Sequence, residues 1–200
     1  MPNINDLIHE IDWMPIDIPK FPYPADVFNP TYDANHAWKY DRLTTRHDHA
    51  YAASQLHPDV MERFPLLKDW LRHLPYVSLR NIKVNFQHSP VRTHVDFKPN
   101  DLDPQLYDNN QYNEPCGYRV LLRGSRNKAL FLSQEEERIF PMMPDDTDVY
   151  VLRQTQTVHG VENDPGRVVM YIHLEIDPAL NHQLLVQSYR KYAQFAIFRS

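Results

Sequence analysis

A chain of 200 residues that is 42% hydrophobic and 12% aromatic can bury a core of its own and has the composition of an ordinary globular protein. Its 21 basic and 26 acidic residues give a net charge of -5, and the basic residues are not clustered, which argues against a duplex nucleic-acid partner. A single cysteine excludes an internal disulfide. Because the start of the sequence shows no signal peptide and no apolar run has the length of a membrane helix, we expect a cytoplasmic protein without membrane contact.

The first 75 residues are expected to form helical and extended segments that wrap over a core. Residues 4–12 favour a short helix, and the proline-broken stretch 14–30 favours an extended segment. Residues 57–75 carry Pro58 near the first helical position and apolar residues at helical spacing. Pro65 lacks a backbone N–H, so we expect it to kink or divide this helix.

Short β-prone segments dominate the middle of the chain. They are residues 76–86, 117–124, 129–133, 138–144, 148–155 and 166–176. With the residues around His94 and His159 they make roughly eight strands, a number typical of a sandwich or barrel. Pro178 then opens a helix with Leu180, Leu184, Leu185 and Tyr189 on one face.

This order of elements predicts a single domain, residues 1–200, that is mainly β with flanking helices. The N-terminal wrap covers residues 1–75, the strand-rich core residues 76–176, and the C-terminal helix residues 177–200. The Asn-, Asp- and Pro-rich stretch from Phe97 to Cys116 lacks periodicity, and loops of this length are often functional. It follows the segment that carries His94, so we expect it to act as a lid.

Three His-x-acid tripeptides are candidate metal-binding pairs, and chance alone would supply roughly one or two. They are His57-Pro58-Asp59, His94-Val95-Asp96 and His173-Leu174-Glu175. The first begins a predicted helix, where residues two apart do not share a face. The other two lie on predicted strands, where positions i and i+2 point the same way and could bind one ion.

A two-histidine, one-carboxylate iron site also needs a third protein ligand. Downstream of His173 only His182 is present, nine residues on and inside a helix. Downstream of Asp96 comes His159, after several strands that allow the chain to return to the first pair. His94, Asp96 and His159 are therefore the favoured ligands.

Arg167 follows His159 by eight residues and opens an apolar strand. It shares one face of that strand with Val169 and Tyr171, while Val168 and the alternating apolar residues after it line the other face. An arginine on the inner face of a β core is costly unless it is paired, so it favours an anionic ligand such as a carboxylate.

The pattern of HVD, His159 and Arg167 on a strand-rich core resembles the iron(II)- and 2-oxoglutarate-dependent oxygenases over residues 76–176. The segments YRVLLRG and TVHGV…GRVVMYIHLEI are similar to the aspartyl/asparaginyl and prolyl hydroxylase branches of that superfamily. The resemblance implies a double-stranded β-helix, a cupin-like jelly roll. It implies Fe(II) bound by His94, Asp96 and His159, and 2-oxoglutarate bound through its distal carboxylate by Arg167.

The activity that the resemblance implies is that of a dioxygenase that consumes O2 and 2-oxoglutarate, releases succinate and CO2, and hydroxylates an amino acid, a peptide side chain or another small molecule. Asn85 and Arg119 are further candidates for cofactor binding, although Asn85 is also compatible with a structural role and Arg119 with a surface position. Two other classes stay open: a cupin-like metalloenzyme that does not use 2-oxoglutarate, and a non-enzymatic β-sandwich that binds a ligand. Arg167 distinguishes the cupin-like metalloenzyme from the oxygenase, because without 2-oxoglutarate there is little reason for an inward arginine at this position. The oligomeric state stays open.

Overall fold

The computed structural model describes residues 3–31, 37–45, 55–96, 114–153 and 156–200, and every statement about the fold concerns these ranges. Within them, the main element is an antiparallel sheet of seven strands. Across this large sheet the order is β13 (Ile197–Phe198), β1 (Ile11–Pro15), β10 (Val149–Leu152), β7 (Gly117–Arg123), β12 (Val168–Ile176), β5 (Tyr76–Gln87) and β2 (Trp38–Arg42).

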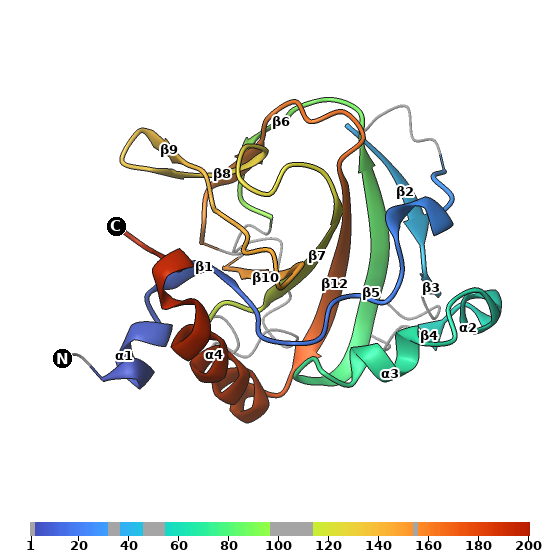
Figure 1. Cartoon of the computed structure of the whole chain (residues 1–200), viewed down its shortest axis with the longest axis horizontal. Coiled ribbons are helices and arrows are strands. Elements are labelled where there is room, and N and C mark those ends of the chain that lie inside the picture. Colours follow the sequence, from blue (N-terminus) through green and yellow to red (C-terminus); the bar gives the residue numbers. More distant parts are fainter. Residues whose placement is uncertain (1–2, 32–36, 46–54, 97–113, 154–155) are drawn as a thin grey trace.

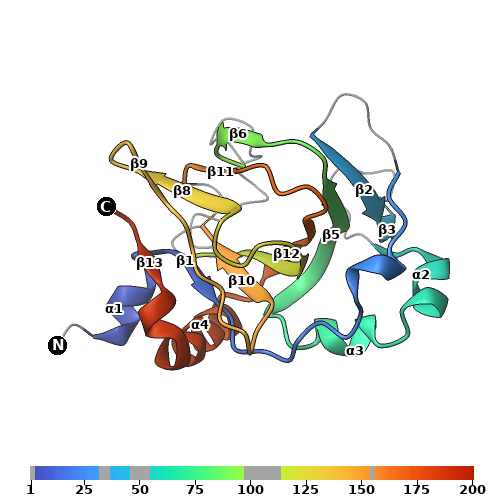
Figure 2. The same ribbon diagram turned by 45° about the horizontal axis from the view of Figure 1, so that its top comes forward.

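A smaller antiparallel sheet lies over one side of the large sheet (Figures 1 and 2). Its strand order within the described residues is β6 (Val91–His94), β11 (His159–Val161), β8 (Leu130–Gln134) and β9 (Glu137–Ile139). A separate pair joins β3 (Thr44–Thr45) to β4 (Gln55–Leu56). Two facing antiparallel sheets, connected by chain segments that pass from one sheet to the other, form a jelly-roll core, so the prediction of a mainly β protein of this class with flanking helices is confirmed.

The helices cover the outer face of the large sheet, opposite the small sheet (Figure 2). They are α1 (Ile4–Ile8), α2 (Pro58–Arg63), α3 (Leu67–Leu71) and α4 (Pro178–Tyr192), with short 3₁₀ turns at η1 (Ala25–Val27) and η4 (Ala193–Phe195). Their buried side chains, such as Phe64 and Leu185, pack with Ile82, Val120 and Met170 from the sheet. This outer core holds the helices against the large sheet.

A second core fills the space between the two sheets. Leu121 and Val169 of the large sheet meet Leu130, Leu132 and Val161 of the small sheet there. Alternation along β12 explains the division, because Val168 and Met170 belong to the outer core whereas Val169 belongs to the inner one. Residues on the inner faces are therefore the ones that can reach a common site.

Several predicted boundaries hold. Pro65 separates α2 from α3, and Pro58 occupies the first turn of α2. Asp177 caps α4, since its side chain accepts hydrogen bonds from the backbone N–H of Ala179 and Leu180.

Other predictions were wrong in extent. The first helix ends at Ile8, and Ile11–Pro15 form strand β1, where Trp13 and Met14 are both 0% exposed because one faces each core. Strands β1, β2 and β13 thus extend the large sheet beyond residues 76–176. The strand expected over residues 138–144 ends at Ile139, since the prolines that follow cannot continue a ladder.

The C-terminal helix packs through most of the expected face, since Leu185 is buried in the outer core and Leu184 and Tyr189 pack against it, but Leu180 does not. Leu180 is 49% exposed, and the buried face of α4 consists of Asn181, Leu185, Ser188 and Tyr192. Tyr118 donates a hydrogen bond to Asn181 Oδ1 at 2.7 Å, which turns this polar residue toward the sheet. Among the described helices none has the length and apolarity required to cross a membrane.

Candidate metal centre

His94, Asp96 and His159 come together at the junction of β6 and β11. His94 ends β6, His159 begins β11, and the two residues are directly opposite each other in the antiparallel register. Their ring centroids are 4.6 Å apart. With Asp96, which lies two residues beyond His94, they offer three ligand atoms that all lie within 4.8 Å of one another. The structure therefore brings His159 beside the HVD pair.

The hydrogen bonds of the two histidines set which ring nitrogen faces the centre. Nδ1 of His94 lies 2.8 Å from the carbonyl oxygen of Arg92, and Nδ1 of His159 lies 3.0 Å from that of Thr157. A carbonyl oxygen only accepts, so each Nδ1 must donate a proton, which leaves a lone pair on Nε2 of the neutral ring. These Nε2 atoms face Asp96 Oδ1 at 3.3 and 3.5 Å.

Three lone pairs thus converge on one small region, and this donor set fits a divalent cation. Neutral histidine rings place no proton between Nε2 and the carboxylate, so a cation is what this arrangement favours. Two imidazoles and one carboxylate are the ligands of non-haem iron(II) sites with open coordination positions. The residues present therefore fit iron(II).

The local charges agree with this assignment. Burial alone would raise the pKa of Asp96, but the positive charge of Arg119 holds it well below its usual range. Burial lowers the pKa of His159, which keeps that ring neutral. A hydrogen bond with Asp96 raises the pKa of His94, so a proton competes with a cation for Nε2 of this residue.

Arg119 lies behind Asp96, on the inner face of β7. It is 2% exposed and donates a hydrogen bond to Asp96 Oδ2, and its guanidinium carbon lies 4.7 Å from the ring centroid of Tyr171. Because Arg119 holds Oδ2, Asp96 presents Oδ1 toward the histidines. Arg119 was predicted to bind the cofactor; the structure places it against a candidate metal ligand, and it is buried, which excludes the alternative of a surface position.

Arg167 lies just before β12 and is 2% exposed. Its Nε and Nη1 atoms are buried and have no hydrogen-bond partner among the described residues, while Nη2 lies 3.5 Å from the hydroxyl of Tyr150. A buried guanidinium with open donors is costly, so it favours an anionic ligand. This is the environment that the sequence predicted for Arg167.

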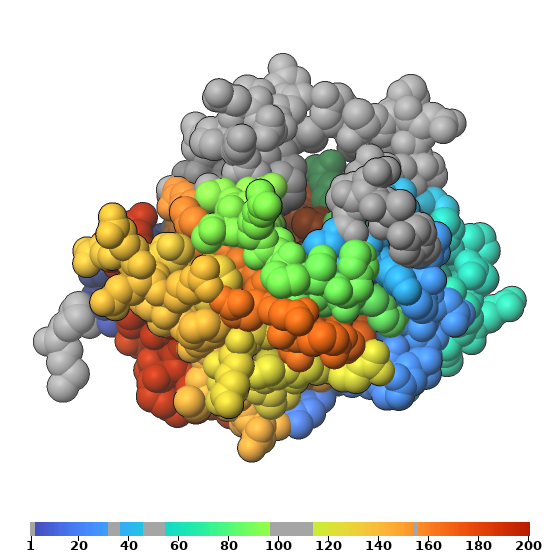
Figure 3. Space-filling model, turned by 90° about the horizontal axis from the view of Figure 1, so that it is seen from above, coloured from blue at the N-terminus to red at the C-terminus, as the bar shows by residue number. Residues whose placement is uncertain are grey.

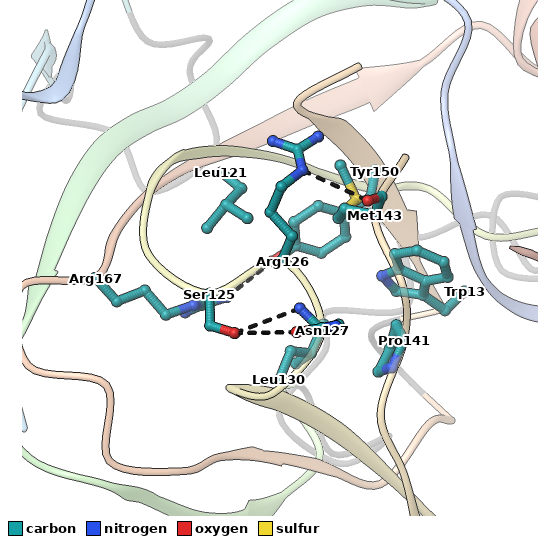
Figure 4. A pocket seen from close by; sticks show the side chains of 10 residues that line it. All are labelled: Trp13, Leu121, Ser125, Arg126, Asn127, Leu130, Pro141, Met143, Tyr150 and Arg167. Atoms are coloured by element: carbon teal, nitrogen blue, oxygen red, sulfur yellow. Dashed lines mark hydrogen bonds between the residues drawn. The ribbon is translucent and has the colours of Figure 1, made fainter. Parts of the chain in front are cut away.

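The side chain of Arg167 lines a pocket between the two sheets (Figure 4). The empty volume of this pocket is about 250 Å³ when its solvent-open mouth is included. The pocket combines apolar walls with a few polar groups, as ligand sites generally do. Its lining consists of Trp13, Leu121, Ser125, Arg126, Asn127, Leu130, Pro141, Met143, Tyr150 and Arg167.

Asn85 is 4% exposed and lies on β5, directly opposite Val169 of the inner core. It therefore shares the inner face of the large sheet with Arg167 and Arg119. Gln87, two residues on, has a structural role: its Nε2 donates to the carbonyl oxygens of Ser89 and Glu162. The segment expected to act as a lid, from Phe97 to Cys116, lies outside the described residues apart from its last three positions.

Sequence reasoning missed Tyr150, which joins the two halves of the site. Its hydroxyl lies 3.5 Å from Arg167 Nη2, it is directly opposite Arg119 in the strand register, and its ring centroid lies 5.9 Å from that of Trp13. Trp13 itself is fully buried, and its Nε1 has no partner among the described residues. The only sequence signal was aromatic character on β-prone segments, which most core residues share.

Two glycines are also part of the site. A Cβ on Gly160, next to His159, would lie 2.5 Å from Cζ of Phe131, so the close contact requires glycine. Gly124 has φ +119°, and a Cβ there would lie 2.8 Å from Cγ of Arg167. The aliphatic part of the Arg167 side chain therefore packs directly against Gly124, where any larger residue would clash with it.

The fold and the converging side chains define a jelly-roll protein with a candidate His-Asp-His metal centre. No protein-family model and no curated protein matches the chain. Among solved structures, the chain is similar to an oxidoreductase of the 2OG-Fe(II) oxygenase family from Burkholderia pseudomallei, with 14% identity and a TM-score of 0.42. That alignment covers 76% of this chain and 75% of the other. At this level of similarity the functional assignment depends on the geometry of the site.

Proposed function

We propose that the protein is an Fe(II)- and 2-oxoglutarate-dependent dioxygenase that hydroxylates an amino acid, a peptide side chain or another small molecule, with release of succinate and CO2. One observation carries the proposal: Arg167, whose buried Nε and Nη1 have no hydrogen-bond partner among the described residues, lies on the same inner face of the large sheet as Arg119, which holds Asp96 of the His94, Asp96 and His159 cluster. A metal-binding triad alone is compatible with many metalloenzymes. A buried arginine in the same core supplies the anion-binding group that a dicarboxylate cosubstrate requires.

In this proposal His94, Asp96 and His159 hold the metal, and Arg167 holds the distal carboxylate of 2-oxoglutarate. When bound, Fe(II) and 2-oxoglutarate together supply the activation of O2 and the oxidation of a C–H bond. The chain's own residues bind and orient: Arg119 fixes Asp96 through Oδ2, and the carbonyl oxygens before each histidine fix the ring tautomers.

The inner core also limits access of water. Leu121, Leu130 and Val169 are buried around the space between the two sheets, close to Arg167 and Tyr150. An apolar wall strengthens the ion pair between a carboxylate and Arg167, because a low dielectric screens charges less. Asn85, on the same inner face, is proposed as a further hydrogen-bonding group for the cosubstrate.

The test is an anaerobic titration with Fe(II), with and without 2-oxoglutarate, followed by the weak visible charge-transfer band of the complex. We expect the band only when both are present. His94→Ala is expected to abolish iron binding, whereas Arg167→Ala is expected to weaken 2-oxoglutarate much more than iron. Arg138→Ala removes an exposed guanidinium that pairs with Glu162 and serves as the matched control.

The outcomes separate the alternatives. Iron binding without any effect of 2-oxoglutarate would favour the cupin-like metalloenzyme. Iron binding that is unchanged in His94→Ala would favour a non-enzymatic ligand-binding protein. A well-folded wild type without the band contradicts the proposed function.

A further inference from the structure

A row of basic and aromatic side chains crosses the inner face of the large sheet, starting at the candidate metal centre. In the strand register Arg119 is opposite Tyr171, Tyr171 is opposite Lys83, and Lys83 is opposite Arg42. The contacts follow the register, since the Arg119 guanidinium carbon lies 4.7 Å and Lys83 Nζ 5.7 Å from the centroid of the Tyr171 ring. Neighbouring side chains in such a row are about 5 Å apart at Cβ.

The row leads from the interior to the edge of the sheet. Arg119 is buried and touches Asp96, Lys83 is half-buried, and Arg42 is exposed on β2, the outermost strand on this side. In Figure 2 the edge formed by β2 and β5 lies beside the small sheet that carries β6 and β11. In Figure 3 the blue surface of β2 adjoins the green surface of the chain that leads into β6.

The two faces of these strands differ in character. The outward residues of β5, Ile82 and Val84, are fully buried in the outer core. The inward residues Asn81, Lys83 and Asn85 are all polar, and of these Asn81 accepts a hydrogen bond from the Thr44 hydroxyl. Like charges directly opposite each other, as Lys83 and Arg42 are, disfavour strand pairing.

We propose that the substrate carries an anionic oxygen group which binds to Lys83 and Arg42 while its reacting carbon lies at the metal centre. This inference rests on the proposed function and adds the class of substrate. Arg167 and the row of Lys83 and Arg42 lie at different positions along the strands, since Arg167 is placed beside Gln87 rather than Lys83. In this proposal Arg167 binds the cosubstrate, and Lys83 and Arg42 bind the substrate. Tyr171 and Trp38, whose ring centroids are 6.3 Å apart, flank the second site with apolar surface.

The test uses matched blocked tripeptides as probes: N-acetyl-Gly-Glu-Gly-amide, its glutamine counterpart and its phosphoserine counterpart. Each is titrated by calorimetry into the anaerobic protein loaded with Fe(II) and 2-oxoglutarate. We expect the glutamate or the phosphoserine peptide to bind at least about tenfold more tightly than the glutamine peptide, equivalent to about 1.4 kcal/mol. The stronger of the two identifies the anion, and added salt is expected to reduce the preference.

The variants Lys83→Met and Arg42→Gln are each expected to abolish most of this preference and to leave the charge-transfer band unchanged. Lys39→Met is the matched control, because Lys39 lies on β2 opposite Phe86 and faces the other side of the sheet. No preference in the wild type, or a preference that survives both substitutions, overturns the inference. Loss of the band in Lys83→Met also overturns it, because Lys83 would then belong to the cosubstrate site.

The same titration with metal-free protein separates this inference from the proposed function. If the wild type lacks the band but an anion preference depends on Lys83 and Arg42, the anion site stands and the oxygenase assignment fails. If the band is present without that preference, the oxygenase assignment stands and the substrate class proposed here fails.

Discussion

Replacement of Arg119 by methionine tests whether a buried ion pair holds Asp96, the carboxylate of the candidate metal centre. Arg119 is 2% exposed and its partner Asp96 is 17% exposed at the side chain. Removal of one partner of a fully buried pair costs about 3–5 kcal/mol, because the remaining charge is left uncompensated. Since Asp96 retains some solvent contact and the neighbouring histidines, we expect a loss of about 2–3 kcal/mol in the free energy of unfolding. This is a large share of the roughly 5–15 kcal/mol that stabilises an ordinary domain.

The assay is urea unfolding followed by circular dichroism, in EDTA and then with Fe(II) under anaerobic conditions. The control is Arg123→Met on the same strand, which removes a surface pair with Asp26 whose side chains are 48% and 81% exposed. Such a pair contributes at most about 1 kcal/mol. Fe(II) is expected to narrow the deficit of Arg119→Met, because a bound cation neutralises Asp96. Equal losses in the two variants, or a deficit that Fe(II) does not reduce, would refute the reasoning.

Three further predictions concern other parts of the chain. Gly160→Ala places a Cβ 2.5 Å from Phe131 Cζ, so we expect the free energy of unfolding in urea to fall by about 1–3 kcal/mol and Fe(II) binding to weaken. A second substitution, Phe131→Leu, is expected to restore part of both losses. Absence of this rescue would mean that the contact does not position β11. Burial raises the pKa of Cys116 to about 12, so at about pH 8 only about one thiol in ten thousand is ionised, and a thiol reagent should react slowly with the native protein but fully in denaturant. Fast reaction of the native protein would contradict this. Burial also raises the pKa of Asp148 above 3.8, so the folded state loses stability as the pH rises past that value and the unfolded carboxyl ionises first. Asp148→Asn should therefore gain stability relative to the wild type as the pH increases toward neutrality, and a constant difference across that range would disprove the assignment.

The sequence was sufficient to predict that the candidate ligands His94 and Asp96 lie together, because strand geometry is local. Residues two apart on a strand share a face, so His94 and Asp96 could be assigned to one site without knowledge of the fold. The same alternation placed Val169 and Tyr171 with Arg167 on the inner face, and the packing of Val169 in the inner core agrees. These predictions needed only a correct strand assignment.

Contacts that depend on pairing between distant strands could not be predicted in the same way. The hydrogen bond from Arg119 to Asp96 and the position of Tyr150 between two guanidinium groups follow from the register of β10, β7 and β12. Strand β1 was not predicted for a different reason. Its residues are buried on both faces, so they lack the alternation by which a half-buried strand is recognised.

The position of β1 in the large sheet has a consequence for how the protein folds. Trp13 pairs with Leu152, about 140 residues later in the chain, and sheets built from such distant partners fold slowly, in milliseconds to seconds. The two histidines of the candidate metal centre are likewise brought together only when β11 docks against β6. The candidate ligand set is therefore complete only after the strands have assembled, so we expect metal binding to follow folding rather than to nucleate it.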